Sequence, residues 1–229
     1  MEKLFNGFTL DTPPGTFPLS TDSMVLSDFV RLPRNASVLD LGSGCGTLGI
    51  LLCARDSGCT VTGIELDETA HHAAVTNIER NSLQSRMKSI CADLRTVSQI
   101  PNAGMYTTCV SNPPYFTGGP LSDASPLARR DDCCDADALF CTAGRTLRFG
   151  GDFYLVHKPD KLALLCACAS RYRLEPKRLC LVRHRADNEI ALILLQCRKG
   201  AKSGLIWEEL CLFDNTGMPT KDYQRIYHL

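Results

Sequence analysis

The feature that most constrains the fold is a glycine-rich turn placed directly after a short buried strand. An apolar run at residues 37–41 is followed by Gly42, Gly44 and Gly46, and then by a helix-like stretch at residues 47–55. Glycine lacks a Cβ atom, so the backbone can turn tightly and approach a ligand. Amide groups at the start of the next helix would face that ligand. The glycines alone are also compatible with a purely structural turn.

The rest of the chain continues this alternation of strands and helices. Further strands are expected at residues 59–65, 87–92, 105–110 and 153–157, with helices at residues 68–81, 137–148 and 161–172. The second of these helices is expected to end at Gly150-Gly151. Two later strands, at residues 178–184 and 190–197, are joined by a short polar turn and should be antiparallel.

These elements predict a single α/β domain. Its sheet should be doubly wound and mostly parallel, with seven strands and an antiparallel last strand. Residues 1–36 form an amino-terminal segment in this interpretation, and residues 37–229 form the catalytic domain. A loop rich in glycine, proline, serine and aspartate is expected at residues 117–132.

Composition bears on location and on metal binding. No apolar run approaches about 18 residues, so no membrane span is expected. The amino terminus lacks the basic region and apolar core of a signal peptide, which favours a cytoplasmic protein. The 13 cysteines contain no C-x-x-C pair, so we interpret them as small apolar residues in a reducing compartment, and expect no metal site.

Charge is unevenly distributed along a chain whose formal net charge is zero. Residues 1–140 carry a net charge of −6, and residues 141–229 carry a net charge of +6. A basic carboxyl-terminal half on a neutral protein is compatible with binding to phosphates. A solvated surface with chance asymmetry is the alternative.

Polar residues stand at the ends of four of the expected strands, where open α/β sheets bind ligands. These residues are Asp40, Glu65, Asp93 and Asn112. Glu65 lies about twenty residues beyond the glycines, where a carboxylate can accept hydrogen bonds from ribose hydroxyls. Asp93 is placed to accept from an adenine amino group. Turn formation or helix capping is the alternative role for each carboxylate.

The strand expected at residues 105–110 runs into Asn112-Pro113-Pro114-Tyr115. An exocyclic amine is a poor nucleophile because its lone pair is delocalised into the ring. The side-chain oxygen of Asn112 and the carbonyl of Pro113 could accept from its N–H bonds and favour a more pyramidal nitrogen. Prolines 113 and 114 stiffen the backbone, and Tyr115 can stack on a base, a contact worth about 1–3 kcal/mol. A simple turn at a strand end is the alternative.

In these residues the chain resembles class I S-adenosylmethionine-dependent methyltransferases. Residues 40–46, 64–67, 92–94 and 112–115 carry the resemblance. It implies a Rossmann-like fold, the cofactor S-adenosyl-L-methionine, and a catalytic role for residues 112–115. It also implies these cofactor-binding residues: Asp40, Gly42, Gly44, Gly46, Glu65, Leu66, Asp93, Leu94 and Asn112. A dinucleotide oxidoreductase would leave residues 112–115 unexplained, and no Gly-Lys-[Ser/Thr] of a phosphate-binding loop occurs.

The same four-residue motif serves adenine-N6 methyltransferases and enzymes that methylate a glutamine amide of peptide release factors. Residues 17–26 are similar to the Thr-Asp-x-x-Leu-Leu segment of the bacterial tRNA1(Val) adenine-N6 methyltransferases. In that family the segment lies over the cofactor, which adds Thr21 and Asp22 as cofactor-binding residues. The glutamine enzymes carry a sizeable helical domain before the glycines, and about 37 residues leave little room for one.

The tRNA1(Val) resemblance covers nearly the whole chain and implies a tRNA substrate, methylated at the adenosine 3′ of the anticodon. An unpaired base is easily moved into a pocket. Basic residues that could hold RNA include Arg129, Arg130, Arg183 and Arg185, with Arg178 and neighbouring residues as further candidates. Alternatives are a release-factor glutamine methyltransferase, a methyltransferase for ribosomal RNA or DNA, and a non-catalytic RNA-binding protein. The sequence makes no prediction of oligomeric state.

Overall fold

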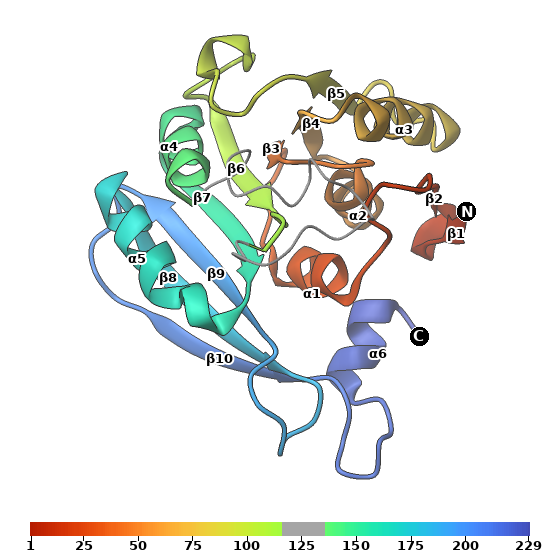
Figure 1. The fold of residues 1–229 in the computed structure, drawn as a ribbon, viewed down its shortest axis with the longest axis vertical. Coiled ribbons are helices and arrows are strands. Elements are labelled where there is room, and N and C mark those ends of the chain that lie inside the picture. The colour runs from red at the N-terminus through yellow and green to blue at the C-terminus, as the bar shows by residue number, and fades with distance from the viewer. Residues whose placement is uncertain (116–135) are drawn as a thin grey trace.

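The computed structural model describes residues 1–115 and 136–229. Their central feature is an eight-stranded sheet with helices on both faces (Figure 1). The predicted doubly wound α/β class is confirmed, with eight strands where seven were expected. In chain order the strands are β3 (Ser37–Leu41), β4 (Thr60–Glu65), β5 (Met87–Cys91), β6 (Tyr106–Ser111), β7 (Leu147–His157), β8 (Leu174–Arg183), β9 (Leu192–Lys199) and β10 (Ile206–Cys211).

The order of the strands across the sheet is β10-β8-β9-β7-β6-β3-β4-β5. Strand β9 is antiparallel to both of its neighbours, β7 and β8, which confirms the expected antiparallel pair. The other strands all run in one direction. Strand β10, which is not among the predicted seven, pairs parallel with β8 and is the outermost strand of the sheet. The carboxyl ends of these parallel strands therefore lie along one edge of the sheet, where "edge" means the line formed by the strand ends.

The sheet separates two apolar cores, because successive side chains of a strand point to opposite faces. Val38 and Val110 face one core, whereas Leu39 and Cys109 face the other. Helices that pack against the first core are α1 (Thr21–Phe29), α2 (Thr47–Arg55), α3 (Glu68–Arg80) and α6 (Lys221–Tyr227). Helices that pack against the second core are α4 (Ala136–Thr146) and α5 (Leu162–Arg171).

The connection from α4 to β7 differs from the prediction that a helix ends at Gly150-Gly151. Helix α4 ends at Thr146, and β7 begins at the next residue. Both glycines lie inside β7, where its pairing with β6 is irregular: Leu147 pairs with Tyr106, and the next pair joins residues 152 and 108. Gly150 has φ +78°, a conformation that glycine adopts without strain. The glycines therefore serve a bulge in a strand, where glycine is also favoured.

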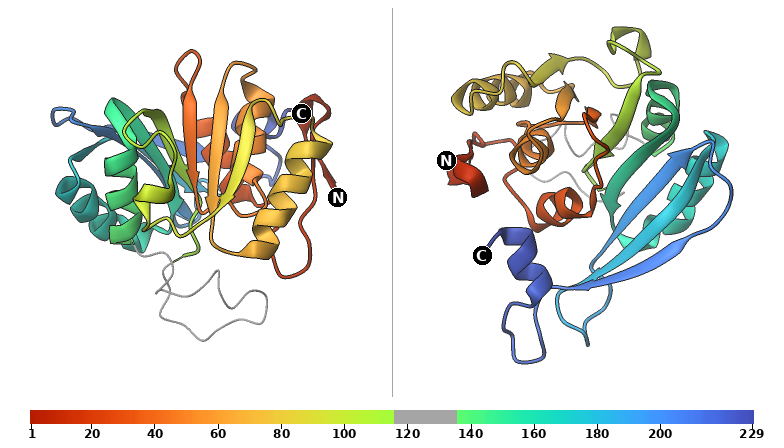
Figure 2. Two further views of the ribbon diagram at one scale, coloured as in Figure 1. Left: turned by 90° about the horizontal axis from the view of Figure 1, so that it is seen from above. Right: turned by 180° about the vertical axis from the view of Figure 1, so that it is seen from behind.

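The two ends of the chain meet on the face covered by α1 and α2 (Figure 2). Near the amino terminus are two short strands, β1 (Glu2–Lys3) and β2 (Thr9–Leu10), which pair antiparallel. The ring of Phe5 stacks on that of His228, with centroids 3.6 Å apart. Val25 is fully buried in the core of the sheet, so residues 1–36 contribute to that core. The domain boundary at residue 36 stays a prediction.

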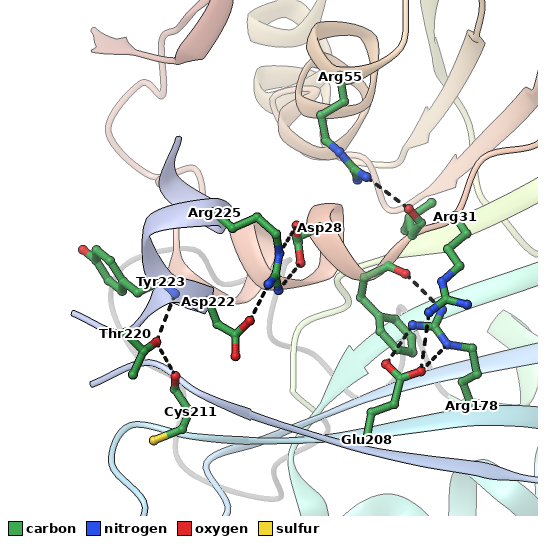
Figure 3. Close-up of polar contacts among 12 residues, drawn as sticks. Asp28, Arg31, Arg55, Arg178, Glu208, Cys211, Thr220, Asp222, Tyr223 and Arg225 are labelled. Atoms are coloured by element: carbon green, nitrogen blue, oxygen red, sulfur yellow. Dashed lines mark hydrogen bonds and ion pairs between the residues drawn. The ribbon is translucent and has the colours of Figure 1, made fainter. Parts of the chain in front are cut away.

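Helix α6 binds α1 through its polar residues. Arg225 forms an ion pair with Asp28 at 3.1 Å, and the Tyr227 hydroxyl donates to Thr21 Oγ1 at 3.2 Å (Figure 3 shows the ion pair). Thr220 caps α6 by accepting from the N–H of Tyr223. The carboxyl-terminal helix thus holds α1 through two polar contacts. No helix among the described residues is long and apolar enough to cross a bilayer.

Candidate functional site

The predicted glycine turn connects β3 to α2 and leaves open space beside it. Gly42, Gly44 and Gly46 have φ values of +70°, +54° and +85°, a region that other residues rarely adopt. A Cβ atom on Gly42 or Gly44 would meet nothing within 4 Å. A Cβ atom on Gly46 would lie 3.1 Å from Met87 Cε, so this glycine also permits close packing on β5. The turn therefore presents bare backbone to an open region.

Glu65, at the end of β4, holds the turn in place. Its Oε2 accepts from the N–H of Gly44 at 2.7 Å, and its Oε1 accepts from the N–H of Asp67 at 2.8 Å. Burial raises the pKa of the Glu65 carboxyl, and these backbone N–H groups oppose the rise. Each carboxylate oxygen has a second lone pair, so Glu65 can accept further hydrogen bonds from a ligand.

Asp40 lies at the end of β3 and is completely buried. Neither of its carboxylate oxygens has a hydrogen-bond partner of regular geometry among the described residues. Burial raises its pKa to about 7; the N–H of Gly49 opposes this rise, and the charge of Glu65 adds to it. An unpaired buried carboxylate is costly, so a cationic ligand nearby would stabilise its charged form.

The third strand end is already occupied by an internal ion pair. Asp93 follows β5, and both of its oxygens accept from the guanidinium of Arg95, at 2.6 to 3.0 Å. This pairing lowers the pKa of the Asp93 carboxyl. Leu94 is buried, whereas Leu66 beside Glu65 is 42% exposed. An exposed leucine at the open region provides an apolar surface for a planar ring.

Residues 112–115 follow β6 and lie between the sheet and the first turn of α1. The Ser111 hydroxyl donates to the carbonyl of Leu41 at 2.7 Å, which ties the end of β6 to that of β3. Asn112 Nδ2 donates to Ser23 Oγ at 3.0 Å, and the Tyr115 hydroxyl donates to Asp22. Burial raises the pKa of that hydroxyl, and the hydrogen bond to Asp22 adds to the rise.

The ring of Tyr115 is held on two further sides. It meets the ring of His157 edge-on, with centroids 5.3 Å apart, and Lys158 Nζ lies 4.8 Å from its centroid. His157 is the last residue of β7, the strand beside β6, and Lys158 is the next residue of the chain. The ring is therefore fixed by contacts that come from α1, β7 and the residue after β7.

The structure brings the predicted strand-end residues to one edge of the sheet. Asp40 lies beside Gly63 in β4 and Val110 in β6, and Glu65 lies beside Cys91 in β5. Because these four strands are adjacent and parallel, Asn112 and the glycine turn share this edge. Thr21 and Asp22, predicted as cofactor-binding, lie in the first turn of α1, where they contact Tyr227 and Tyr115.

Two buried polar residues at the site were not predicted from the sequence. Ser23 is 4% exposed and contacts Asn112, and Asn77 is completely buried in α3. Asn77 Nδ2 donates to the carbonyls of Cys45 and Asp11, at 3.0 and 2.8 Å, so it anchors the glycine turn. The one signal for Asn77 is a polar residue on the face of α3 that also buries Ala70, Ala74 and Ile78.

The basic residues predicted to hold RNA divide into several groups. Arg183 ends β8, and Arg185 follows it, at the edge of the sheet where the parallel strands end. Arg178 is instead 6% exposed, and its guanidinium binds Glu208 at 2.7 and 2.9 Å (Figure 3). Its predicted role in phosphate binding is therefore wrong, because the guanidinium is buried and is already paired with the partly exposed carboxylate of Glu208. Arg129 and Arg130 lie outside the described residues, as does the loop expected at residues 117–132.

The cysteines described by the structure, 11 in number, are all free thiols. Most are buried in the two cores, where they pack as small apolar side chains. Across residues 1–115 and 136–229, no group of three or more His, Cys, Asp or Glu side chains could hold a metal ion.

Comparison with known proteins adds three findings. Residues 19–163 match the family model "Methyltransferase small domain". The chain is similar to proteins named tRNA1(Val) (adenine(37)-N6)-methyltransferase. It is 33% identical to that of Tolumonas auensis, over 91% of this chain and 87% of the relative. It is 32% identical to that of Shewanella halifaxensis, over 77% of this chain and 71% of the relative.

Among solved structures, a predicted O-methyltransferase from Agrobacterium tumefaciens superposes with a TM-score of 0.77 and 20% identity, covering 91% of this chain and 96% of that one. The 16S rRNA N2 G1207 methyltransferase of T. thermophilus, in complex with AdoMet and guanosine, superposes with a TM-score of 0.61 and 23% identity. That match covers 86% of this chain and 49% of the other. At these identities the superpositions bear on the fold alone.

Proposed function

Because this chain belongs to the methyltransferase small-domain family and to the tRNA1(Val) (adenine(37)-N6)-methyltransferases, we propose that it methylates N6 of an adenosine in tRNA. The methyl donor is S-adenosyl-L-methionine, and the target is the adenosine next to the anticodon. One observation carries the proposal: Asn112 stands at the same sheet edge as the glycine turn, with its amide held by Ser23. A tRNA substrate also favours a cytoplasmic location.

The residues around the glycine turn fit such a donor. Gly42 and Gly44 leave open space, Leu66 offers an apolar surface, and the unpaired carboxylate of Asp40 favours a cation. Glu65 has lone pairs left for ribose hydroxyls. When bound, the donor supplies a methyl group on a positively charged sulfonium. The full proposed set of donor-binding residues is Thr21, Asp22, Asp40, Gly42, Gly44, Gly46, Glu65, Leu66, Asp93, Leu94 and Asn112.

Residues 112–115 would orient the adenine. Asn112 Oδ1 and the Pro113 carbonyl accept from the two N–H bonds of the exocyclic amine, which aims the nitrogen lone pair at the methyl group. Tyr115, fixed by Asp22 and Lys158, offers a ring face for stacking. Catalysis then rests mainly on positioning. No strong base is needed before transfer, because the methylated amine is acidic and loses its proton afterwards.

Replacing Glu65 with alanine is expected to weaken donor binding by about 1–3 kcal/mol. The variant loses the carboxylate that would bind ribose and also the acceptor that holds the N–H of Gly44. Isothermal titration calorimetry with the donor measures the change in its dissociation constant. Glu68→Ala is the matched control, because Glu68 is an exposed carboxylate only three residues away. Equal donor affinities in the two variants would remove Glu65 from the donor site.

Replacing Arg183 and Arg185 together with alanine is expected to lower tRNA affinity and its salt dependence. Each phosphate contact contributes about 0.7–0.9 to the slope of log K against log salt concentration, so the slope should flatten by about 1–2. The double change Arg145→Ala with Arg148→Ala removes the same charge near the start of β7, at the opposite sheet edge. Filter binding at several salt concentrations should separate the two variants; identical slopes would place RNA elsewhere.

The reaction itself is tested with labelled donor and tRNA from a strain that lacks the gene. Methyl transfer to this tRNA, with N6-methyladenosine identified by nucleoside mass spectrometry, is the expected result. Peptide release factor is included as a second acceptor, because glutamine amides fit the same motif. Transfer to the release factor and none to tRNA would contradict the proposed function.

A further inference from the structure

The first turn of α1 connects the site to the carboxyl-terminal helix through three consecutive residues. Thr21 accepts from Tyr227 in α6, Asp22 accepts from Tyr115, and Ser23 accepts from Asn112. The side chains of Asp22 and Ser23 therefore bind the two ends of the four-residue motif. The contact between Ser23 and Asn112 joins residues 89 positions apart, at 3.0 Å.

We propose that Ser23 is a positioning residue that holds the Asn112 side-chain amide in place, with Oδ1 toward the methyl acceptor. This inference rests on the proposed function. The Asn side chain has an oxygen that accepts and an NH₂ group that donates. Only the oxygen can receive an N–H bond of the acceptor amine; a flipped amide would direct N–H against N–H. A serine hydroxyl can accept or donate; in the observed contact it accepts from Nδ2, which holds the amide with Oδ1 left for the substrate.

The burial of Ser23 strengthens this constraint. Ser23 is 4% exposed, so water hardly competes with Asn112 for its hydroxyl. Its backbone N–H donates to Ser20 Oγ at 3.4 Å, within the capped first turn of the helix. The serine is therefore fixed with respect to the helix that carries it.

Helix α1 is itself held at both ends, so Ser23 has a fixed position with respect to the sheet. At its carboxyl end, Arg178 donates to the carbonyl of Phe29 at 3.2 Å and lies 4.0 Å from the ring centroid of the same residue. Arg225 of α6 binds Asp28 in the same turn (Figure 3). These contacts come from β8 and α6, so the carboxyl-terminal third of the chain supports the amide indirectly.

Replacing Ser23 with alanine is expected to lower kcat about tenfold, the effect of one ordinary hydrogen bond, with donor affinity unchanged. Ser27→Ala is the matched control. Ser27 lies one turn further along α1, is 3% exposed, and its hydroxyl has no hydrogen-bond partner among the described residues. Its removal should leave kcat and donor affinity unchanged. Equal kcat in both variants would overturn the role of Ser23.

A second background separates orientation from simple loss of packing. Asn112→Ala removes the amide that Ser23 is proposed to hold, so Ser23 has nothing to position in that background. In the Asn112→Ala background, Ser23→Ala should change kcat less than about threefold. A tenfold loss in both backgrounds would show that Ser23 acts through packing alone, and would overturn the inference.

Proton exchange of the Asn112 side-chain amide provides a readout independent of turnover. In the ¹⁵N-labelled protein these amide protons should exchange more slowly in the wild type and in Ser27→Ala than in Ser23→Ala. Equal exchange in all three would contradict the inference. If the wild-type protein fails to methylate tRNA, the proposed function is wrong, and the exchange rates still decide whether Ser23 holds the amide.

Discussion

Replacing Asn112 with alanine is expected to lower kcat by about 10²–10³-fold, the usual effect of removing one group that holds a transition state. The loss falls on kcat because the amide oxygen orients the attacking nitrogen. Donor affinity should fall much less than kcat, since Asn112 is one of eleven proposed donor-binding residues and the glycine turn, Glu65 and Asp40 remain. Single-turnover methylation of tRNA, with donor binding measured separately, checks both parts.

The matched control is Asn112→Asp, which keeps an acceptor at the same position. This variant should retain more activity than Asn112→Ala, because a carboxylate can still accept from the amine. An alanine variant that binds donor and turns over at the wild-type rate would refute the role of Asn112. A variant whose loss of activity is fully explained by its loss of donor binding would show that Asn112 serves the donor site alone and does not orient the acceptor.

Replacing Asp40 with asparagine is expected to change how stability depends on pH. Burial raises the pKa of Asp40 from 3.8 to about 7 in the folded protein. The folded state therefore holds the proton more tightly than the unfolded state, and stability is lost as pH rises from about 4 through 7. At about 1.4 kcal/mol per pKa unit, the loss at pH 8 is up to about 4 kcal/mol.

The asparagine variant cannot ionise at this position, so it escapes this loss. Its free energy of unfolding, relative to the wild type, should rise between about pH 4 and pH 8, with most of the rise below pH 7. Denaturant unfolding of donor-free protein at several pH values measures it. Asp160→Asn is the control, because the Asp160 side chain is 66% exposed. A pH-independent difference for the Asp40 variant would contradict the raised pKa.

Most of the central sheet could be predicted because its strands are buried on both faces and bounded by turns. The expected strand at residues 37–41 and helix at residues 47–55 match β3 and α2. Gly150-Gly151 misled the prediction, because glycine favours a strand bulge as well as a helix end. Strand β10 was missed because its apolar and polar residues do not alternate. It is the outermost strand, and its apolar residues Ile206 and Trp207 are exposed. It pairs with β8, and its Glu208 binds the buried Arg178.

The candidate site could be predicted as far as the chain's local order determines it. Parallel strands end at one edge, so Asp40, Glu65 and Asn112 could be grouped from the sequence. The partners of these residues could not be predicted in the same way. Glu65 accepts a hydrogen bond from the N–H of Gly44, and Asp93 forms an ion pair with Arg95. Such hydrogen bonds depend on side-chain directions that spacing along a chain does not determine.

The sequence by itself determined the fold class, the glycine turn and the positions of the polar strand ends, because each follows from local backbone preference and strand periodicity. Only the tertiary structure decided that α1 places Ser23 on Asn112 and Asp22 on Tyr115. Those contacts span 89 and 93 residues. They exist because two apolar faces, one on α1 and one on the sheet, pack together. Packing of this kind fixes distances that no local pattern encodes.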